Sequence, residues 1–384
     1  MREFLSFINR CFFERVDSPG PLNRPDPSHP DWVRHTAFLG IWDDYHKDIL
    51  GISMPEESIA ALAMALLTVF RAGGNQVSVR TYPATLAPHE FGLIRLVHAT
   101  QDFTQVLPAI DGALIQNLKA AFSGQLPTPH LLSTQAGADK VNSVLGGADR
   151  NVDERLRYIQ GVGRTLTERY GGEFQRIYSD CDGDAARIFA ALCEFPGIKS
   201  KKANMLLRDF MAEGVWTYRT NTDVINIIAD NRVMRIALRT GIVRLASGRP
   251  FNNLIDQYDL QYVSLVRATE EAFRKVWLKC RDLNGGVDIV SSPAGFDRFL
   301  FDLGDGRSGC CRPNARSCET GRKPKKFYAW MKTALNYETL ESCPFNAVCR
   351  AENKILNAPY AIQNNTWNSQ IFTNAGGGGG VRGV

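Results

Sequence analysis

The chain has 384 residues, of which 44% are hydrophobic and 22% are charged. These proportions are those of a folded globular protein and exclude a disordered or fibrous chain. The net charge of +5 permits a nucleic-acid partner without requiring one. The longest apolar run, from Ile59 to Phe70, is shorter than the roughly 20 residues that span a bilayer. We therefore expect an intracellular protein with no membrane partner.

The first 125 residues predict helices but no chemistry. Residues 1–50 are rich in proline and aromatic residues, and we expect an irregular arm there. The stretch from Ser53 to Glu56 is typical of a capping box, which would begin a buried helix that ends near Gly73. A further helical stretch is expected from about residue 88 to residue 119. We therefore predict an N-terminal helical region, residues 1–125, of unknown role.

Helical patterns continue from His130 to Tyr178. The segment that begins at His130 reads HLLSTQAGADKVNSVL, and a second segment from Asp153 to Tyr178 predicts two helical pieces. We expect breaks at Gly161/Gly163 and at Gly171/Gly172. The Gly-Val-Gly sequence at the first break is interpreted as a turn, because a phosphate-binding loop would follow a strand.

Two amphipathic helices joined by a tight turn are predicted from Asp184 to Asp209. Asp184 can cap the first helix, and the turn contains the sequence Phe-Pro-Gly-Ile before the second helix begins. Gly197 in this turn would let the first N–H groups of the second helix approach a phosphate. Positive charge is supplied there by Lys199, Lys201 and Lys202.

Asp230 stands just before a further helical stretch that runs to Val243. By itself, an aspartate at this position is an N-cap. Arginines recur in and after the stretch, at Arg232, Arg235, Arg239, Arg244 and Arg249. We expect most of them on a solvated face, with some in contact with phosphates. Another helix is expected over residues 270–279.

Nine cysteines are present, and five of them lie between Cys310 and Cys349. Such clustering favours metal ligation over a disulfide framework. Cys311 and Cys318 are separated by six residues, and Cys343 and Cys349 by five. Four thiolates can hold a [4Fe–4S] cluster or a structural zinc ion, so the spacing leaves both open. Cys310 could replace Cys311 as a ligand, and the other cysteines are interpreted as ordinary thiols.

The chain between the two cysteine pairs is strongly basic. Seven basic residues stand against one acidic residue from Cys310 to Thr333. Because aromatic residues are mixed with them, this composition suits a surface that contacts phosphates and stacks on bases. We expect DNA contacts from Arg312, Arg316, Lys323, Lys325 and Lys326. The glycine-rich end of the chain is expected to be a flexible tail.

Taken together, these motifs resemble the helix-hairpin-helix DNA glycosylases, and within them the iron–sulfur branch typified by endonuclease III. The family hairpin reads Leu-Pro-Gly-Val-Gly-x-Lys-x-Ala and is followed by an Asp-x-x-Val-x-Arg-Ile segment. The matching positions are Pro196, Gly197, Ile198, Lys201, Ala203, Asp230, Val233, Arg235 and Ile236. The family's opening segment, Leu-Leu-Ser-x-Gln-Ala, is matched from Leu131 to Ala136. Lys199 stands where the family has its second hairpin glycine.

The resemblance implies a mostly α-helical, two-lobed enzyme that removes a damaged, mismatched or modified base from double-stranded DNA. Lys201 would be the nucleophile of an AP lyase, Asp230 the catalytic carboxylate, and Gln135 the residue that enters the base stack. Gly197, Lys199 and Lys202 would meet the DNA backbone. The family's cluster ligands correspond to Cys311, Cys318, Cys343 and Cys349, although the gap between the second and third is far longer here.

We accordingly expect a glycosylase core at residues 126–300, a cluster and basic loop at residues 301–352, and a C-terminal extension at residues 353–384, in a monomer. Two alternatives are open: a monofunctional glycosylase in which Asp230 activates water, and a non-enzymatic DNA-binding protein with structural zinc. The stretch between Lys201 and Asp230 is longer than in the family and could shape an unusual pocket. Oxidised pyrimidines are the substrate that the resemblance implies, but the residues do not specify the base.

Overall fold

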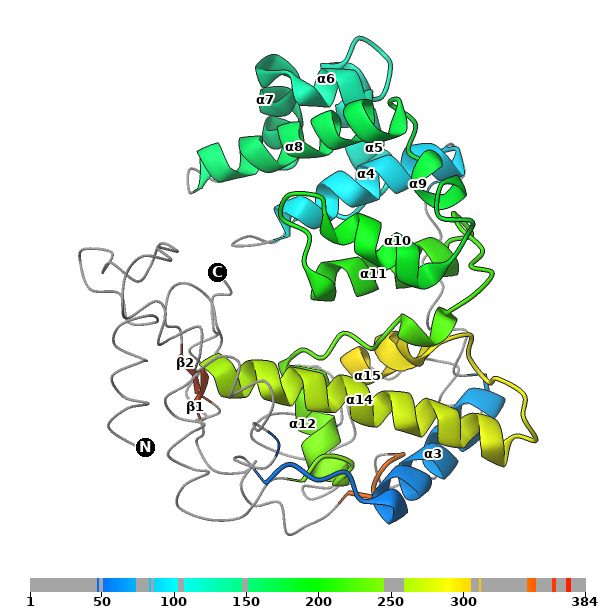
Figure 1. Ribbon diagram of the computed structural model, residues 1–384. Coiled ribbons are helices and arrows are strands. Elements are labelled where there is room, and N and C mark those ends of the chain that lie inside the picture. The colour runs from blue at the N-terminus through cyan, green and yellow to red at the C-terminus, as the bar shows by residue number, and fades with distance from the viewer. Residues whose placement is uncertain are drawn as a thin grey trace, which may run out of the picture. The chain divides into compact units, whose positions relative to one another are not determined.

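A computed structural model of the chain is mostly helical (Figure 1), as predicted, whereas the specific glycosylase fold stays a prediction. It describes Lys47, residues 51–73, Pro83, residues 86–102, 107–146, 151–244, 259–304, Cys311, and residues 344–349, 361–363 and 371–373. The helices form two compact units. None of the helices within these ranges is long and apolar enough to cross a membrane.

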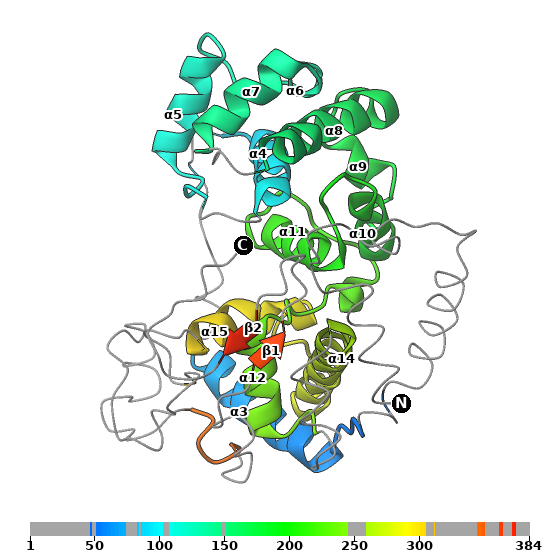
Figure 2. The ribbon, with the colours of Figure 1, turned by 90° about the vertical axis from the view of Figure 1, so that its left-hand side faces the viewer.

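The first unit, called the hairpin unit, contains most of the helices in the middle of the chain. They are α4 (Pro88–Gln101), α5 (Gly112–Ala121), α6 (Pro129–Ser133), α7 (Gln135–Val144), α8 (Val152–Tyr170), α9 (Arg176–Ser179), α10 (Ala185–Cys193), α11 (Ser200–Ala212) and the short 3₁₀ turns η3 (Thr222–Val224) and η4 (Pro293–Phe296). Helices α4, α6 and α7 all pack against α8, which is the longest helix of this unit (Figure 2).

Helix α8 is unbroken over 19 residues, so the turn expected at Gly161 and Gly163 is wrong. A side chain at either glycine would collide with a neighbour. A Cβ on Gly163 would lie 2.4 Å from the backbone nitrogen of Ser133, and one on Gly161 would lie 2.5 Å from Pro196. The glycines therefore permit close packing rather than a turn. The helix does end at Gly171, in the left-handed conformation, as expected.

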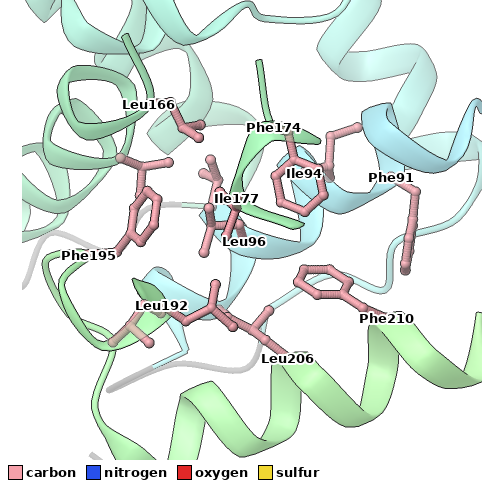
Figure 3. Close-up of a cluster of buried hydrophobic side chains, with 14 of the residues drawn as sticks. Phe91, Ile94, Leu96, Leu166, Phe174, Ile177, Leu192, Phe195, Leu206 and Phe210 are labelled. Atoms are coloured by element: carbon pink, nitrogen blue, oxygen red, sulfur yellow. The ribbon is translucent and has the colours of Figure 1, made fainter. Parts of the chain in front are cut away.

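The core of the hairpin unit is built from apolar faces of these helices (Figure 3). Leu192 and Phe195 come from α10 and the turn after it, and Leu206 and Phe210 come from α11. All four are at most 1% exposed. Their helical spacing is the one that predicted two amphipathic helices, and it directs both helices onto one core.

Two aromatic residues of the long stretch after α11 pack into this core. The rings of Trp216 and Phe210 lie 4.6 Å apart, and those of Trp216 and Phe174 stack at 4.9 Å. Tyr218 is also buried and donates its hydroxyl to the carbonyl oxygen of Leu207. Trp216 and Tyr218 therefore have a packing role. The expectation that the stretch shapes a pocket stays a prediction.

The second unit, called the cysteine unit, contains helices from both sides of the hairpin unit in sequence. They are α3 (Glu56–Arg71), α12 (Asn231–Thr240), α14 (Asp259–Leu283) and α15 (Asp297–Leu303), with the short antiparallel strands β1 (Ala361–Gln363) and β2 (Ile371–Thr373). α14 includes the helix predicted over residues 270–279 and packs along α3. α12 contacts both α14 and α15.

The N-terminal helices do not form a region of their own among the described residues. α3 belongs to the cysteine unit, whereas α4 and α5 belong to the hairpin unit. The capping box expected at Ser53 is wrong, because Pro55 precedes α3 and no side chain caps it. Ser53 instead pairs with Arg244 through two backbone hydrogen bonds of 2.8 Å each. The helical stretch expected from residue 88 to 119 is interrupted between α4 and α5.

Candidate functional site

The predicted hairpin is present as α10, a tight turn and α11. Asp184 caps α10, and its Oδ1 accepts a hydrogen bond of 2.9 Å from the backbone N–H of Arg187. The N–H of Ile198 donates to the carbonyl oxygen of Phe195 at 3.0 Å and closes the turn. Gly197 lies inside it with a φ of +78°, a conformation that favours glycine. The structure thus confirms the hairpin and its glycine.

Contacts with α8 fix the backbone of this turn. Pro196 packs against Gly161, where no side chain intervenes. The ring of Tyr158, also on α8, covers Gly197 of the turn. A Cβ on Gly197 would lie 2.8 Å from Cδ2 of Tyr158. The hydroxyl of Tyr158 donates to Glu154 one turn earlier on α8. The turn is therefore held by a proline and a glycine backbone against one rigid helix.

The first turn of α11 follows directly. Its N-cap residue, Lys199, has an extended backbone and provides no side-chain cap. Ala203 is the first residue whose N–H bonds back to it, with a distance of 2.9 Å to the Lys199 carbonyl oxygen. The three residues between them have N–H groups without an intrahelical acceptor, as in any α-helix. These groups and the helix dipole favour an anion at this end.

The three hairpin lysines differ in their surroundings. Lys199 and Lys201 are exposed, whereas Lys202 is half-buried. The Nζ of Lys202 donates to the carbonyl oxygen of Thr100, on α4, at 3.4 Å. Burial lowers the pKa of Lys202 to about 8, against the attraction of Asp102. Lys199 and Lys201 are thus accessible to a ligand, and Lys202 instead faces α4.

Asp230 caps α12, in the cysteine unit. Its Oδ1 accepts hydrogen bonds from the backbone N–H groups of Arg232 and Val233, at 2.9 and 3.0 Å. This is the N-cap geometry expected from the sequence. No hydrogen bond to its Oδ2 is found among the described residues. Lys201 and Asp230 belong to different units, and their approach to a common substrate stays a prediction.

Gln135 is exposed at the start of α7. Thr134 caps this helix by accepting a hydrogen bond of 3.1 Å from the N–H of Gly137. The side-chain amide of Gln135 donates to Asp139 at 3.0 Å and accepts from Gln160 of α8 at 2.9 Å. These bonds orient an accessible side chain. Its entry into a base stack stays a prediction.

Cys311 is held against α12 by two arginines. Its Sγ accepts a hydrogen bond of 3.2 Å from Nη1 of Arg239, and its carbonyl oxygen accepts one of 3.0 Å from Nε of Arg235. Both arginines are buried, at 6% exposure or less, so the solvated face expected for them is wrong. The backbone N–H of Cys311 donates to the carbonyl oxygen of Leu303 on α15. A charged donor beside the sulfur suits a thiolate ligand.

Cys349 lies on a turn that packs against α15. Its N–H donates to the carbonyl oxygen of Phe345 at 2.8 Å. The buried ring of Phe345 meets Phe299 of α15 edge-to-face, with the centroids 5.9 Å apart. Phe299 and Leu303 are four residues apart on α15, which is about 6 Å along the axis. The segments of Cys311 and Cys349 are therefore anchored to neighbouring turns of one helix.

The remaining predicted metal ligands and predicted basic DNA contacts lie outside the described residues. They are Cys318, Cys343, Arg312, Arg316, Lys323, Lys325 and Lys326. Within the described part of the chain, no group of three or more His, Cys, Asp or Glu side chains could hold a metal. The thiols of Cys311 and Cys349 suit a thiolate-bound metal in chemistry, and their binding of a common metal stays a prediction. Cys181, Cys193 and Cys280 are free buried or half-buried thiols, as expected.

Comparison with known proteins adds no relatives. The chain matches no protein-family model and no curated protein. The helix-hairpin-helix resemblance therefore rests on the quoted residues alone.

Proposed function

We propose that the protein is a DNA glycosylase with AP-lyase activity at Lys201. The hairpin carries this proposal. A glycine at positive φ, fixed against α8, leads into a helix start that presents Lys199 and Lys201 to solvent beside uncapped N–H groups. Such a surface suits the phosphates that flank a nucleotide. Its sequence is also the part of the chain that matches the glycosylase family most closely.

Base removal would begin with nucleotide flipping. A base inside a duplex has to leave the stack before an enzyme can reach its glycosidic bond, at a cost of a few kcal/mol. Phosphate contacts at the hairpin would offset part of this cost. Gln135 would occupy the position that the base has left, oriented by its hydrogen bond to Gln160.

Lys201 would supply the nucleophile. Its neutral amine attacks C1′ of the flipped nucleotide, and the bond between C1′ and the base breaks, so that the base leaves with the electron pair. Loss of a proton from nitrogen and opening of the sugar ring give a Schiff base between Lys201 and C1′. Removal of a C2′ proton then expels the 3′ phosphate and cuts the strand. The side chain is exposed, as this chemistry requires.

Asp230 would stabilise positive charge on the sugar and accept the proton that the amine loses. Two backbone N–H groups hold its Oδ1 and so orient the carboxylate, and no group of the described residues donates a hydrogen bond to its Oδ2. The same geometry favours a second candidate function. An oriented carboxylate could activate water without any lysine, which would give base removal and no strand cleavage.

A [4Fe–4S] cluster would be held by Cys311, Cys318, Cys343 and Cys349. When bound, it supplies four iron–thiolate bonds that connect distant parts of the chain. Arg239 would donate to the ligand at Cys311, and Phe345 would anchor the turn that carries Cys349. The basic segment between Cys318 and Cys343 would then be fixed at both ends for contact with the DNA backbone.

Borohydride trapping tests the lyase proposal. Native protein incubated with a duplex that contains one abasic site should give a covalent protein–DNA band. Lys201→Ala should abolish the band and Asp230→Asn should weaken it, whereas Lys140→Ala, which changes an exposed lysine of α7, should leave it unchanged. No band from native protein that binds the duplex would reject the lyase. Release of free base would then identify a monofunctional glycosylase.

The metal is tested separately. Protein purified without oxygen should absorb visible light and contain about four irons per chain if the cluster is present. A colourless protein that contains zinc would favour the non-enzymatic DNA-binding alternative, provided that both base release and trapping fail.

A further inference from the structure

Helices α4 and α11 are connected by a polar contact at each end. Arg95 of α4 lies 2.7 Å from Asp209 near the end of α11. Lys202, in the first turn of α11, donates to the carbonyl oxygen of Thr100 near the end of α4. Thr100 at the end of α4 thus contacts the start of α11, and Arg95, earlier on α4, contacts the end of α11. The two helices therefore run antiparallel.

The contact at Asp209 stabilises the fold. Burial alone would raise the pKa of this carboxyl group, but the guanidinium groups of Arg208 and Arg95 outweigh burial and hold it below its ordinary value. The ionised form is therefore favoured in the folded protein. This pair is sufficient to align the two helices at one end.

The contact at Lys202 differs, because burial opposes its charge. Among the described residues, the charged groups around the ammonium are Asp102 after α4, Glu154 and Arg155 on α8, and Lys201 on α11. The two acids favour the charge, and the two basic groups oppose it. Burial exceeds all of them, so the pKa of Lys202 falls to about 8. A neutral side chain here would avoid that cost, and costs of this kind are common at functional positions.

The ammonium of Lys202 donates to a carbonyl oxygen at the end of α4. Thr100 is one of the last four residues of α4, where carbonyl oxygens commonly lack an N–H donor from the helix itself. An ammonium at this end donates to the Thr100 carbonyl oxygen and complements the helix dipole. Lys202 therefore acts as a cap of α4 that is contributed by α11.

We infer that Lys202 is a positioning residue for Lys201, an inference that rests on the proposed lyase function. By capping α4, the Lys202 side chain fixes the rotation of the first turn of α11. Adjacent residues on a helix point about 100° apart. With Lys202 directed at α4, Lys201 is turned away from it and into solvent, where the abasic sugar would be bound.

Stability measurements distinguish this role from a structural one. The folded-state pKa of Lys202 lies below its ordinary value of 10.5, so the folded protein binds fewer protons than the unfolded chain between pH 8 and 10.5. The native protein should therefore gain stability as pH rises through that window. Lys202→Met should remove this gain and should be at least as stable as native protein at pH 7. Urea denaturation at pH 7 and pH 9.5 measures both.

Trapping kinetics at saturating abasic duplex test the inference itself. Lys202→Met should trap roughly 10- to 100-fold more slowly, because a misplaced nucleophile loses much of its rate. Its affinity for the duplex should change little. Lys202→Arg keeps a charged donor at all accessible pH values and should recover much of the rate. Lys140→Met should behave as native protein.

The pH profile gives the sharpest readout. The trapping rate of native protein relative to Lys202→Arg should decline above about pH 8, where the Lys202 ammonium loses its proton and its charged hydrogen bond to Thr100. The ratio removes the effect of pH on the Lys201 nucleophile, which is the same in both proteins. If Lys202→Met traps at the native rate, the inference is overturned and the lyase proposal is unaffected. If Lys202→Met fails to fold, Lys202 has a structural role, and the inference is overturned as well. Absence of trapping by native protein would overturn both.

Discussion

The hairpin and the surroundings of Cys311 are built in opposite ways. The hairpin is one continuous stretch, in which Asp184 caps the first helix and Gly197 closes the turn. The Cys311 site combines α12, α15 and a separate turn at residues 344–349, and a buried arginine reaches the sulfur from α12. Local rules of capping and turn formation explain the first. Only long-range contacts explain the second, so substitutions should affect the two regions separately.

The largest effect should come from Phe210→Ala. Phe210 is 0% exposed and packs against Phe174 and Trp216. The cavity should cost about 3–5 kcal/mol of unfolding free energy, measured by urea denaturation. Hydrogen exchange should locate the loss in α10 and α11 and leave α12 protected. Val287→Ala, at a residue that is 63% exposed, is the control and should change stability by less than about 0.5 kcal/mol. Equal loss of protection in α12 would contradict the comparison.

Cys311→Ala should lower stability in the cysteine unit and leave the hairpin unit unchanged. The change removes a buried acceptor of the charged Arg239 guanidinium, at a cost of about 1.5–3 kcal/mol. If the proposed cluster is bound, the change should also remove its iron, as elemental analysis would show. It should expose α12 amides to exchange while α11 stays protected. Cys193→Ala, at a half-buried thiol of α10, is the matched control and should keep the metal. Full metal content in Cys311→Ala would show that Cys311 is not a ligand.

Gly197→Ala should have a smaller effect on stability. The left-handed conformation and the contact with Tyr158 should together cost about 1–3 kcal/mol. Gly214→Ala is a close control, because its φ is +69° and a Cβ there meets nothing within 4 Å. The difference between the two variants measures the contact with Tyr158. Only Gly197→Ala should also weaken binding to an abasic duplex, as fluorescence anisotropy would show.

The smallest change in stability is expected at Asp230. Asp230→Ala removes both bonds to the first turn of α12 and should cost about 0.5–2 kcal/mol, measured by thermal denaturation. Asp230→Asn keeps an acceptor for the cap and should cost less. Both should lose base release to the same extent, because neither has a carboxylate. If Asp230→Asn releases base at the native rate, Asp230 caps α12 and has no catalytic role.

The hairpin could be predicted because every signal for it is local. Asp184, the Pro-Gly turn and the apolar spacing of α10 and α11 all act within a few residues. The same local rules failed at Gly161 and Gly163. A glycine pair looks alike in sequence whether it ends a helix or lets another backbone approach. Only the packing of α6 and Pro196 against α8 distinguishes the two.

The surroundings of Cys311 could be predicted only in part. The spacing of the cysteines indicated a metal site, but nothing indicated that Arg235 and Arg239 would be buried beside it. Their separation by four residues places both on one face of α12, and such a pair usually faces water. A buried acceptor far along the chain changes that outcome. The burial of Trp216 could not be predicted for the same reason, since Phe174, on which it stacks, is far away in sequence.

The two glycines of α8 also have a consequence for the length of DNA that the hairpin unit would cover. One glycine faces the backbone that precedes Gln135, and the other faces the proline that precedes Lys199. Neither contact contains a flexible side chain, so a single stiff helix sets the separation between Gln135 and Lys199, the two residues that the proposed function would place on DNA. The number of nucleotides spanned is then a property of α8. Longer or shorter loops elsewhere would change which base is accepted but not the nucleotide spacing of the footprint.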